Sequence, residues 1–343
     1  MRSRLFIAAT VLVAMVAIVA VAGAGKIGNG SSSGSALVFV PNPVQSLGDE
    51  SLTDQKDSDG AVPATAYHAV RLTNLDGSGF LRGDYADVYS STGDLAFSPT
   101  NTFAYTRSDD RFEQVMAYYW MTEAQKYIHN LGFGVTRPPI NNEPQNARIN
   151  QLGYDNSFET DHPKDELRFG KGGVDDAEDG EVILHEYGHA IHQSQGFNFA
   201  PEENGAISEG FGDYWAVTVS QVVRTALGRP ASADPACVAD WDATSYTRSE
   251  PHCLRRLDEG KTYPDDLVGE VHADGEIWSQ ALWDIRNAIG NVKGDTAILE
   301  GQFGFDGGTM PSLAADIVSA ARTLYGPATA AQVTDAFESR GIL

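Results

Sequence analysis

The pentapeptide HEYGH at residues 185–189 constrains this chain more than any other feature of its sequence. It lies in an amphipathic run, about 179–194, that we expect to be helical. Because an α-helix turns about 100° per residue, His185 and His189 share one face and can reach one metal ion. Glu186 lies at the edge of that face, where its carboxylate can hydrogen-bond a metal-bound water without being a ligand. The pattern predicts part of a hydrolytic metal centre.

A third ligand is needed, because catalytic zinc takes three protein ligands and leaves one position for water. The candidate is Glu209, in a second segment, 204–216, that we also expect to be helical. Asp213 lies one turn further along the same face, where it can accept the remaining ring N–H of a ligand histidine and fix its tautomer. We therefore predict one zinc ion (Zn2+) held by His185, His189 and Glu209.

The spacing of these ligands distinguishes among classes of zinc protease. A metzincin has a third histidine six residues after the second, and that position is Gln195. Glu209 instead follows His189 by 20 positions, which is the spacing of the thermolysin and fungalysin families. The GxMEN segment of aminopeptidases with a related motif is absent. The chain thus resembles a thermolysin/fungalysin-like zinc metalloendopeptidase, a gluzincin.

Two further segments extend the resemblance towards the substrate. The sequence YDNSF at 154–158 is similar to the family's YNNAF edge strand, whose backbone pairs with an extended peptide, so the resemblance implies substrate binding by Asn156 and Ser157. The sequence EVHADGEIW at 270–278 resembles the fungalysin VHAxGExW segment. Its histidine, His272, would stabilise the oxyanion.

The resemblance, which runs from roughly residue 100 to the end, also implies a fold. We expect an α+β, two-lobed thermolysin-like metalloprotease with an N-terminal β-rich lobe, a central zinc-binding helix and a C-terminal α-helical lobe. The periodicity predicts helices at 113–131, 207–227, 275–289, 312–325 and 328–339, strands in hairpins at 36–40, 69–72 and 85–89, and short strands within 148–170. The lobes would span 37–196 and 197–343.

The function that follows is a zinc-dependent endopeptidase acting through a zinc-bound water. The resemblance implies cleavage on the amino side of a bulky apolar residue, with Glu186 as general base and later as proton donor to the leaving amine. One departure weakens the oxyanion site. A tyrosine that donates to the oxyanion in thermolysin lies nine residues before the glutamate ligand, and here that position is Ala200, beside Phe199.

Calcium (Ca2+) is a second candidate cofactor. The acidic residues of the run 175–181 could bind it through hard oxygen ligands, or could place negative charge at a helix N-terminus, and we favour the latter. The family's long calcium-binding insertion is not visible in this sequence.

The N-terminus predicts export. A basic start, an apolar run at 5–22 and Ala-x-Ala sites indicate a signal peptide at 1–24, with an uncleaved anchor as the alternative. A Gly/Ser-rich linker at 25–36 follows. The balance of 24 basic against 47 acidic residues, a net charge of −23, argues against nucleic acid and anionic membranes as partners. We expect a secreted monomer that acts on proteins or peptides.

The two cysteines, Cys237 and Cys253, favour a disulfide in an exported protein.

Other polar residues near the motifs have ordinary interpretations. We expect His252 to be a surface loop residue, His192 to flank the ligand face, and Arg255 with Arg256 to be a solvated basic pair, although either arginine could bind a substrate carbonyl. Asp265, Asp266 and Glu270 are equal candidates to orient His272.

Two other classes of function remain open. A non-catalytic zinc-stabilised extracellular adhesion or cell-wall-binding protein would keep the fold, but zinc ligation alone does not need Glu186. An exopeptidase would need a blocked pocket and an acidic group for the substrate amine, of which the sequence shows no clear signature.

Overall fold

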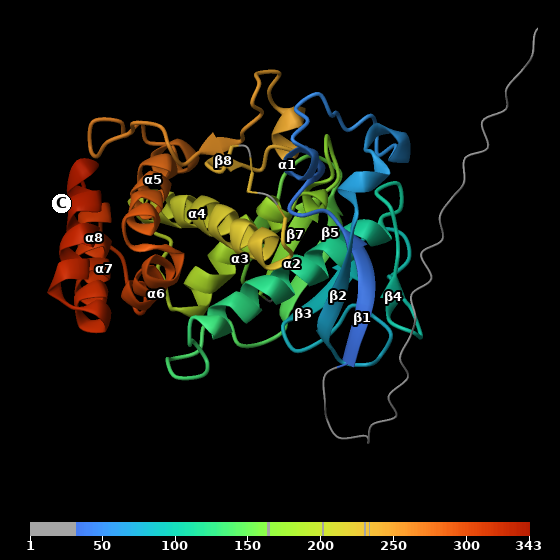
Figure 1. Ribbon diagram of the computed structural model, residues 1–343, viewed down its shortest axis with the longest axis horizontal. Helices are drawn as coiled ribbons and strands as arrows, with labels where there is room; N and C mark the ends of the chain where they lie inside the picture. The colour runs from blue at the N-terminus through green and yellow to red at the C-terminus, as the bar shows by residue number, and fades with distance from the viewer. Residues whose placement is uncertain (1–31, 163–164, 201, 230, 233) are drawn as a thin grey trace, which may run out of the picture. The chain divides into compact units, whose positions relative to one another are not determined.

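The chain folds into a β-rich first part, a central pair of helices and a helical last part (Figure 1). The computed structural model describes residues 32–343 apart from 163–164, 201, 230 and 233. This architecture is the expected α+β, two-lobed thermolysin-like fold. The predicted signal peptide, 1–24, lies outside the described residues. The expected linker ends earlier than 36, because Ser32–Val38 forms the first strand.

Two sheets make up the first part. One is three-stranded in the order β2-β1-β4, and the other is four-stranded in the order β3-β5-β7-β6. Their strands are β1 (Ser32–Val38), β2 (His68–Leu75), β3 (Ala86–Ser90), β4 (Thr102–Phe103), β5 (Gln145–Leu152), β6 (Phe158–Thr160) and β7 (Glu166–Gly170). A small pair, β8 (Cys237–Val238) with β9 (Arg255–Arg256), lies further along the chain.

The hairpins predicted for the first 110 residues are wrong in their connections. β1 and β2 are antiparallel, but residues 39–67 separate them, and β3 pairs in parallel with β5 in the other sheet. Alternating apolar residues show which face of a strand is buried and do not show which strand lies beside it. The strands predicted within 148–170 are confirmed, and β6 forms the antiparallel edge next to β7.

Helix α2 (Arg111–Asn130) joins the two sheets to the metal-site helix. It packs against β1, β3 and the central helix α3 (Gly180–Ser194). Its large side chains, among them Tyr118 and Trp120, are buried, so the helix lies in the core of the first part.

The last part is helical, as predicted. It comprises α4 (Glu202–Ala226), α5 (Val271–Ile289), α6 (Asn291–Gly301), α7 (Met310–Tyr325) and α8 (Pro327–Ser339). The segment 207–227 begins earlier than expected, at Glu202, and α6 was not predicted. A short helix α1 (Pro43–Leu47) and 3-10 turns at Asp59–Ala61, Ala64–Ala66, Asp176–Glu178 and Asp242–Ser245 complete the described elements.

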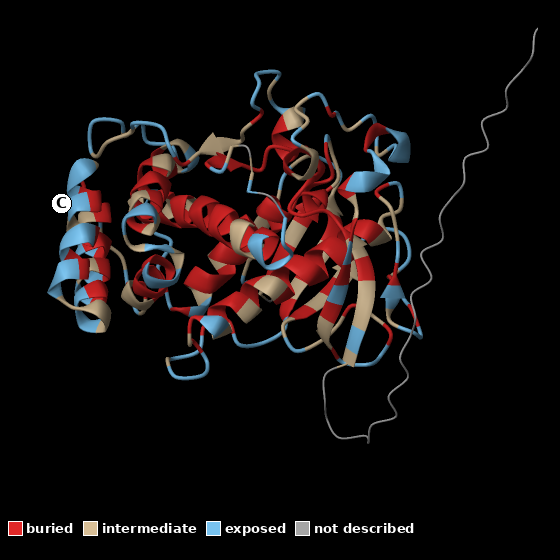
Figure 2. Cartoon of the chain, in the orientation of Figure 1, coloured by how far each residue is buried: buried red, intermediate tan, exposed pale blue. Residues whose placement is uncertain are grey.

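Burial is greatest around the central helices (Figure 2). α3 and α4 are buried almost all round, whereas α7 and α8 turn one face to solvent. Polar side chains on a helix in such surroundings need hydrogen-bond partners or opposite charges nearby, because burying them unpaired is unfavourable. None of the described helices is both long and apolar enough to cross a membrane.

Candidate metal centre

The two histidines of the pentapeptide lie one turn apart on α3, as the helical spacing predicts. Their ring centroids are 4.9 Å apart and the rings are nearly perpendicular. Asp179 fixes the start of this helix, since its side chain accepts a hydrogen bond from the backbone N–H of Glu181. Both His185 and His189 therefore project from a helix whose first turn is capped and buried.

Glu209 on α4 completes the predicted triad. One of its oxygens, Oε2, is 3.2 Å from His185 Nε2, and the other, Oε1, is 3.6 Å from His189 Nε2. One potential ligand atom from each of the three residues lies within 4.8 Å of the others. Two imidazole nitrogens and one carboxylate converging in this way form the donor set that a catalytic zinc ion takes, so the residues fit the metal.

Each histidine is held by a bond at its other ring nitrogen. His185 Nδ1 lies 2.9 Å from Asp213 Oδ1, and His189 Nδ1 lies 2.8 Å from Ser208 Oγ. These partners leave Nε2 of each ring directed towards Glu209. The expected position of Asp213 is thus observed, and bonds of this kind fix the tautomer of a ligand histidine.

Charge around the triad favours a cation. Burial opposes a charge on His185, but the carboxylates of Asp213 and Glu209 outweigh it and raise the pKa of His185 to about 10. Burial similarly opposes charge on Asp213, yet the guanidinium of Arg255 lowers its pKa to about 2. The site therefore attracts positive charge to the point where the Nε2 atoms meet Glu209.

Glycines allow α3 and α4 to approach closely enough for this geometry. A Cβ on Gly188 would lie 2.9 Å from the Cα of Gly212, and a Cβ on Gly212 would lie 2.8 Å from His185 Nδ1. Real Cβ atoms essentially never come so close, so both positions need glycine. A Cβ on Gly210 would clash with the carbonyl oxygen of Gly275 in α5. The absence of a side chain at Gly210 therefore allows α5 to pack closely against α4.

Glu186 is placed to act on a reactant and not on the protein. Its residue is 6% exposed, and its Oε2 has no hydrogen-bond partner among the described residues. Burial, with an added contribution from the nearby carboxylate of Glu209, raises the pKa of Glu186 to about 8. A carboxylate with a pKa near neutrality can both accept and return a proton.

His272 lies at the start of α5 with about half of its side chain exposed. Its Nδ1 is 2.7 Å from Glu270 Oε1, and its Nε2 is 3.5 Å from Glu209 Oε2. Of the three acids that could have oriented the ring, the structure selects Glu270, which also caps α5 through the N–H of Ala273. The sequence could not choose among them, because all three lie close in the chain.

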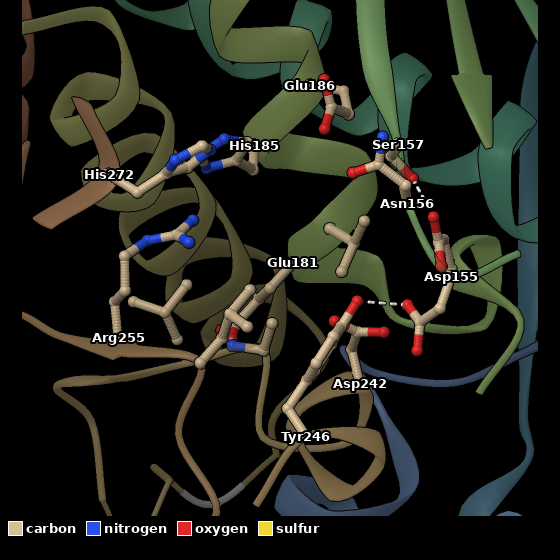
Figure 3. A pocket seen from close by; sticks show the side chains of 15 residues that line it. Asp155, Asn156, Ser157, Glu181, His185, Glu186, Asp242, Tyr246, Arg255 and His272 are labelled. Atoms are coloured by element: carbon tan, nitrogen blue, oxygen red, sulfur yellow. Dashed lines mark hydrogen bonds between the residues drawn. The ribbon is translucent and has the colours of Figure 1, made fainter. Parts of the chain in front are cut away.

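Two cavities adjoin the triad, and His185, Glu186 and His272 line both. The first, of about 250 Å³, extends from these residues towards Asp242 (Figure 3). The second, of about 420 Å³, extends towards Phe199 and Ser208. Asn156 and Ser157 line both cavities as well, in the segment that leads into β6.

Arg255 differs most from its expected surroundings. It is not part of a solvated pair, because its Nε and Nη2 donate to Asp213 at 2.6 and 2.7 Å and it lines the first cavity. Arg256 instead pairs with Asp234 and Asp258 away from the triad. Adjacent residues on a strand point to opposite faces, which is the one signal that could have separated the two arginines.

Of the two other histidines discussed from the sequence, His252 differs from expectation and His192 does not. His252 is not a surface residue; it is 8% exposed and its Nδ1 lies 3.0 Å from Glu50. His192 flanks the ligand face, as expected, and stacks between Phe197 and Phe211 at centroid distances of 4.2 and 4.4 Å.

The acidic run before α3 is interior, and the expected negative charge at the helix N-terminus is found at its end, where Asp179 is the cap and Glu181 lies in the first turn. Five acids of this run are almost fully buried: Asp175, Asp176, Glu178, Asp179 and Glu181. Glu178 binds Arg107, and Glu181 accepts bonds from Ser220 and the N–H of Ala239. Apart from the cap at Asp179, these groups link α3 to distant segments.

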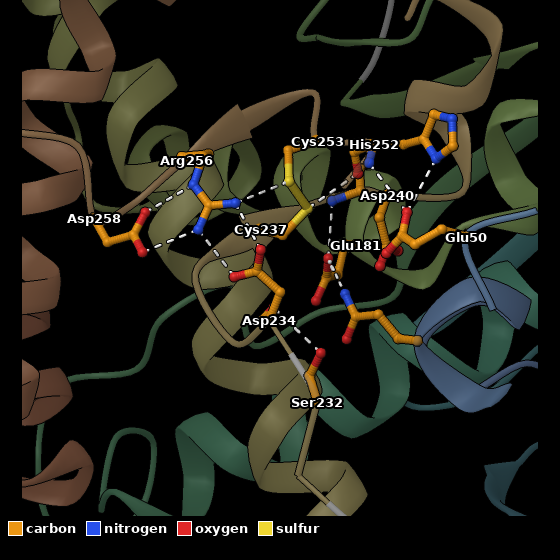
Figure 4. Close-up of a disulfide and its surroundings, with 12 residues drawn as sticks. Glu50, Glu181, Ser232, Asp234, Cys237, Asp240, His252, Cys253, Arg256 and Asp258 are labelled. Atoms are coloured by element: carbon orange, nitrogen blue, oxygen red, sulfur yellow. Dashed lines mark hydrogen bonds and ion pairs between the residues drawn. A yellow bond between two sulfur atoms is a disulfide. The ribbon is translucent and has the colours of Figure 1, made fainter. Parts of the chain in front are cut away.

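The predicted disulfide is present between Cys237 and Cys253 (Figure 4). It closes a loop whose ends are also paired as β8 and β9. Residues inside that loop, including Asp242 and Tyr246, line the first cavity. The loop therefore forms one wall beside the triad.

Comparisons with known proteins agree with this geometry. A family model described as fungalysin metallopeptidase matches residues 101–342. Among solved structures, the precursor of protealysin, a metalloproteinase from Serratia proteamaculans, aligns with a TM-score of 0.58 at 16% identity, over 76% of this chain and 88% of that one. At this identity the likeness shows the fold alone. A search of curated proteins found no match.

Proposed function

The chain belongs to the fungalysin family of zinc-dependent metallopeptidases, and from this premise we propose that it is an endopeptidase whose zinc is held by His185, His189 and Glu209. The observation that carries the proposal is the convergence of three ligand atoms within 4.8 Å. Glu186 stands beside them with an oxygen that no described residue satisfies. A structural zinc site does not require such a group, so the arrangement favours hydrolysis.

The role that we propose for each side chain follows from its position. Zinc, when bound, supplies a Lewis acid that polarises the scissile carbonyl and lowers the pKa of a water molecule. Glu186 accepts the proton of the attacking water through its free Oε2 and later gives that proton to the leaving amine. Asp213 and Ser208 hold the two ligand rings throughout.

His272 would act on the oxygen that becomes negative. Glu270 holds the ring through Nδ1, which directs Nε2 towards Glu209 and the space shared by the two cavities. A doubly protonated ring donates from Nε2 to an oxyanion at that point, and such preorganised donors contribute strongly to acyl transfer. Arg255, committed to Asp213, positions the carboxylate that holds His185.

The substrate would lie across both cavities. Asn156 and Ser157 line the two and lead directly into the edge strand β6, whose free edge can accept an extended peptide. This placement supports protein or peptide substrates, which the family also implies.

Export is part of the proposal. The disulfide between Cys237 and Cys253 supports export, because disulfides form and persist in oxidising compartments. We propose a secreted monomer with a signal peptide at 1–24, a first lobe that includes β1 and ends at residue 196, and a second lobe at 197–343. The adhesion-protein alternative is less well supported, because it gives no role to the buried, unpaired carboxylate of Glu186.

A digest of an unfolded protein tests the function. The purified chain should contain one zinc per molecule, cleave internal peptide bonds, lose activity with a chelator and regain it with zinc. Glu186→Gln should keep its zinc while turnover falls by about 10²–10⁴-fold, the range for loss of a general base. Glu338→Gln, an exposed change on α8, is the control. No chelator-sensitive cleavage by the native chain, or more than a tenth of its activity in Glu186→Gln, would refute the proposal.

A further inference from the structure

The first cavity beside the triad has an acidic wall built from three separate segments. Asp155 comes from the loop before β6, Asp176 from the turn before α3, and Asp242 from the disulfide-closed loop. One carboxylate oxygen from each lies within 4.8 Å of the other two. Figure 3 shows Asp155 and Asp242 with Tyr246 on one side of the cavity, opposite His272 and Arg255.

These carboxylates are only partly satisfied by the protein. Tyr246 donates its hydroxyl to Asp155, while Ser157 and the N–H of Gly170 donate to Oδ2 of Asp176. Oδ1 of Asp176 and Oδ1 of Asp242 have no hydrogen-bond partner among the described residues. The two residues are 2% and 4% exposed. Buried carboxylate oxygens without donors are rare, and the two residues that carry them, Asp176 and Asp242, are among those that line the cavity.

The other charged groups around the cavity do not neutralise this wall. Arg255 is the one lysine or arginine among the described lining residues, and its guanidinium is committed to Asp213. Glu181 is satisfied by Ser220 and the N–H of Ala239, and so adds no free acceptor. His185 and Glu186 belong to the reactive centre. The cavity therefore offers a cluster of carboxyl groups, not matched by a free cation among the described lining residues, to whatever enters it.

The shape of the cavity suits a long side chain with a cationic end. Its 250 Å³ is many times the roughly 10–15 Å³ that one water needs. Three apolar side chains also line the cavity, namely Val182, Val238 and Leu254. Methylene groups can pack on these while an ammonium or guanidinium reaches the carboxylates.

We propose that this cavity binds the side chain of a substrate lysine or arginine immediately beside the scissile bond, an inference that rests on the proposed peptidase function. It replaces the bulky apolar residue that the resemblance implies. A divalent ion is less well matched, because calcium takes six to eight oxygen ligands at 2.3–2.6 Å and the cavity is far larger than an ion. The continuity of the cavity with Glu186 and His272 also favours a substrate group.

The test begins with the zinc-loaded, full chain and a digest of unfolded proteins, with cut sites read by mass spectrometry. We expect lysine or arginine at one fixed position beside the cut. Peptides with lysine, norleucine or acetyl-lysine at that position then isolate the charge. The kcat/KM for lysine should exceed that for the two uncharged residues by about ten- to a hundredfold, as for a hydrogen bond between charged groups.

Variants of the acidic residues test whether they cause the preference for lysine. Asp242→Asn and Asp176→Asn should each lower kcat/KM for the lysine peptide by about tenfold or more while leaving the norleucine peptide within about threefold. Asp335→Asn, the same change on an exposed position of α8, should leave both rates unaltered. Thermal melts of each variant separate loss of preference from loss of folding, since unfolding would lower both rates together.

Three results would overturn the proposal. Cuts flanked by apolar residues, with chelator-sensitive activity intact, would refute this inference and leave the peptidase function standing. Equal rates for lysine and norleucine would do the same. A second metal bound one-to-one in the native protein and lost in Asp242→Asn would assign the wall to a cation site. Absence of any cleavage would instead refute the proposed function itself.

Discussion

At the scale of single residues, His272 offers the sharpest test of the mechanism. Its ring is fixed by Glu270 at Nδ1 and its side chain is half exposed, so it is available to a reactant. The position where thermolysin has a second donor holds Ala200, beside Phe199, and neither side chain can donate. His272 is therefore the principal donor to the oxyanion in our proposal.

His272→Ala should lower kcat by an amount equivalent to about 2.7–4 kcal/mol, the range for a lost oxyanion donor, with KM and zinc content nearly unchanged. Steady-state kinetics and elemental analysis provide the measurements. His162→Ala, which alters a side chain that is 88% exposed, is the control. Normal kcat, or a mutant that sheds its zinc, would remove His272 from the mechanism and direct attention to Arg255.

The residues of the triad could be predicted because helical spacing is a local property. His185 and His189 share a face of α3 in any α-helix, and Asp213 follows Glu209 by one turn. Arg255 and Asp242 could not be placed in the same way. Asp242 lies inside the disulfide-closed loop and Arg255 just after it, and no periodicity in the sequence records that this segment reaches the cavity beside the triad.

At the scale of secondary-structure elements, the close crossing of α3 and α4 sets the relative positions of the histidines on α3 and Glu209 on α4. Gly212→Ala would add a methyl group within 2.8–3.1 Å of three atoms of the His185 ring. The ring or the helix must move, so we expect zinc affinity to fall by about 10–100-fold, as for other changes that disturb the orientation of a ligand. Competition against a chelator measures this affinity.

Gly205→Ala on the same helix is the matched control for that prediction. Its Cβ would approach the side chain of Val271 alone, with the terminal Cγ1 at 3.0 Å and the Cβ at an ordinary 3.7 Å, and the terminal methyl group can shift. This variant should keep native zinc affinity. Equal affinities for Gly212→Ala and the native protein would show that the close approach of the helices does not position the ligands.

The sequence predicted helices better than sheets, for a physical reason. A helix is specified by neighbours three and four residues away, so α2, α3, α7 and α8 were placed to within a few residues. Sheet partners are distant in the chain: β3 pairs with β5, more than 50 residues later. Helix α6 is absent from the prediction because it is short, has Gly294 in its interior, and begins after Gly290 and ends at Gly301.

At the scale of the whole molecule, the disulfide holds the loop whose residues line one side of the first cavity. Cys237 and Cys253 are 16 positions apart, for which the chain-entropy model gives about 3 kcal/mol of stabilisation. The variant with serine at both positions should unfold at a lower denaturant concentration. Its free energy of unfolding should be smaller than that of the native protein by about 3 kcal/mol. Native protein kept under reducing conditions should match it. Identical unfolding curves for the native protein and the serine variant would contradict this expectation.

The buried acids make the stability of the whole molecule depend on pH. Burial raises the pKa of Asp176 from 3.8 to about 7, because the charged form loses its hydration. A carboxyl whose pKa is higher in the folded state contributes stability below its unfolded pKa, and this contribution is lost as pH rises through the folded value. Between about pH 4 and pH 7, ionisation of Asp176 therefore opposes folding.

Asp176→Asn removes this titration while keeping the size of the side chain. The stability difference between the variant and the native protein should move in favour of the variant from pH 5 to pH 8, by about 2 kcal/mol, since one pKa unit corresponds to 1.36 kcal/mol. Comparing variant and native protein at each pH cancels the titration of groups that do not interact with Asp176, whereas Asp155, Asp242 and Glu186 lie close enough for its charge to act on them. Asp335→Asn, exposed on α8, should show a constant difference. A constant difference for Asp176→Asn as well would mean that this carboxyl has the same pKa in the folded and unfolded states. Its burial beside the triad would then not make ionisation unfavourable.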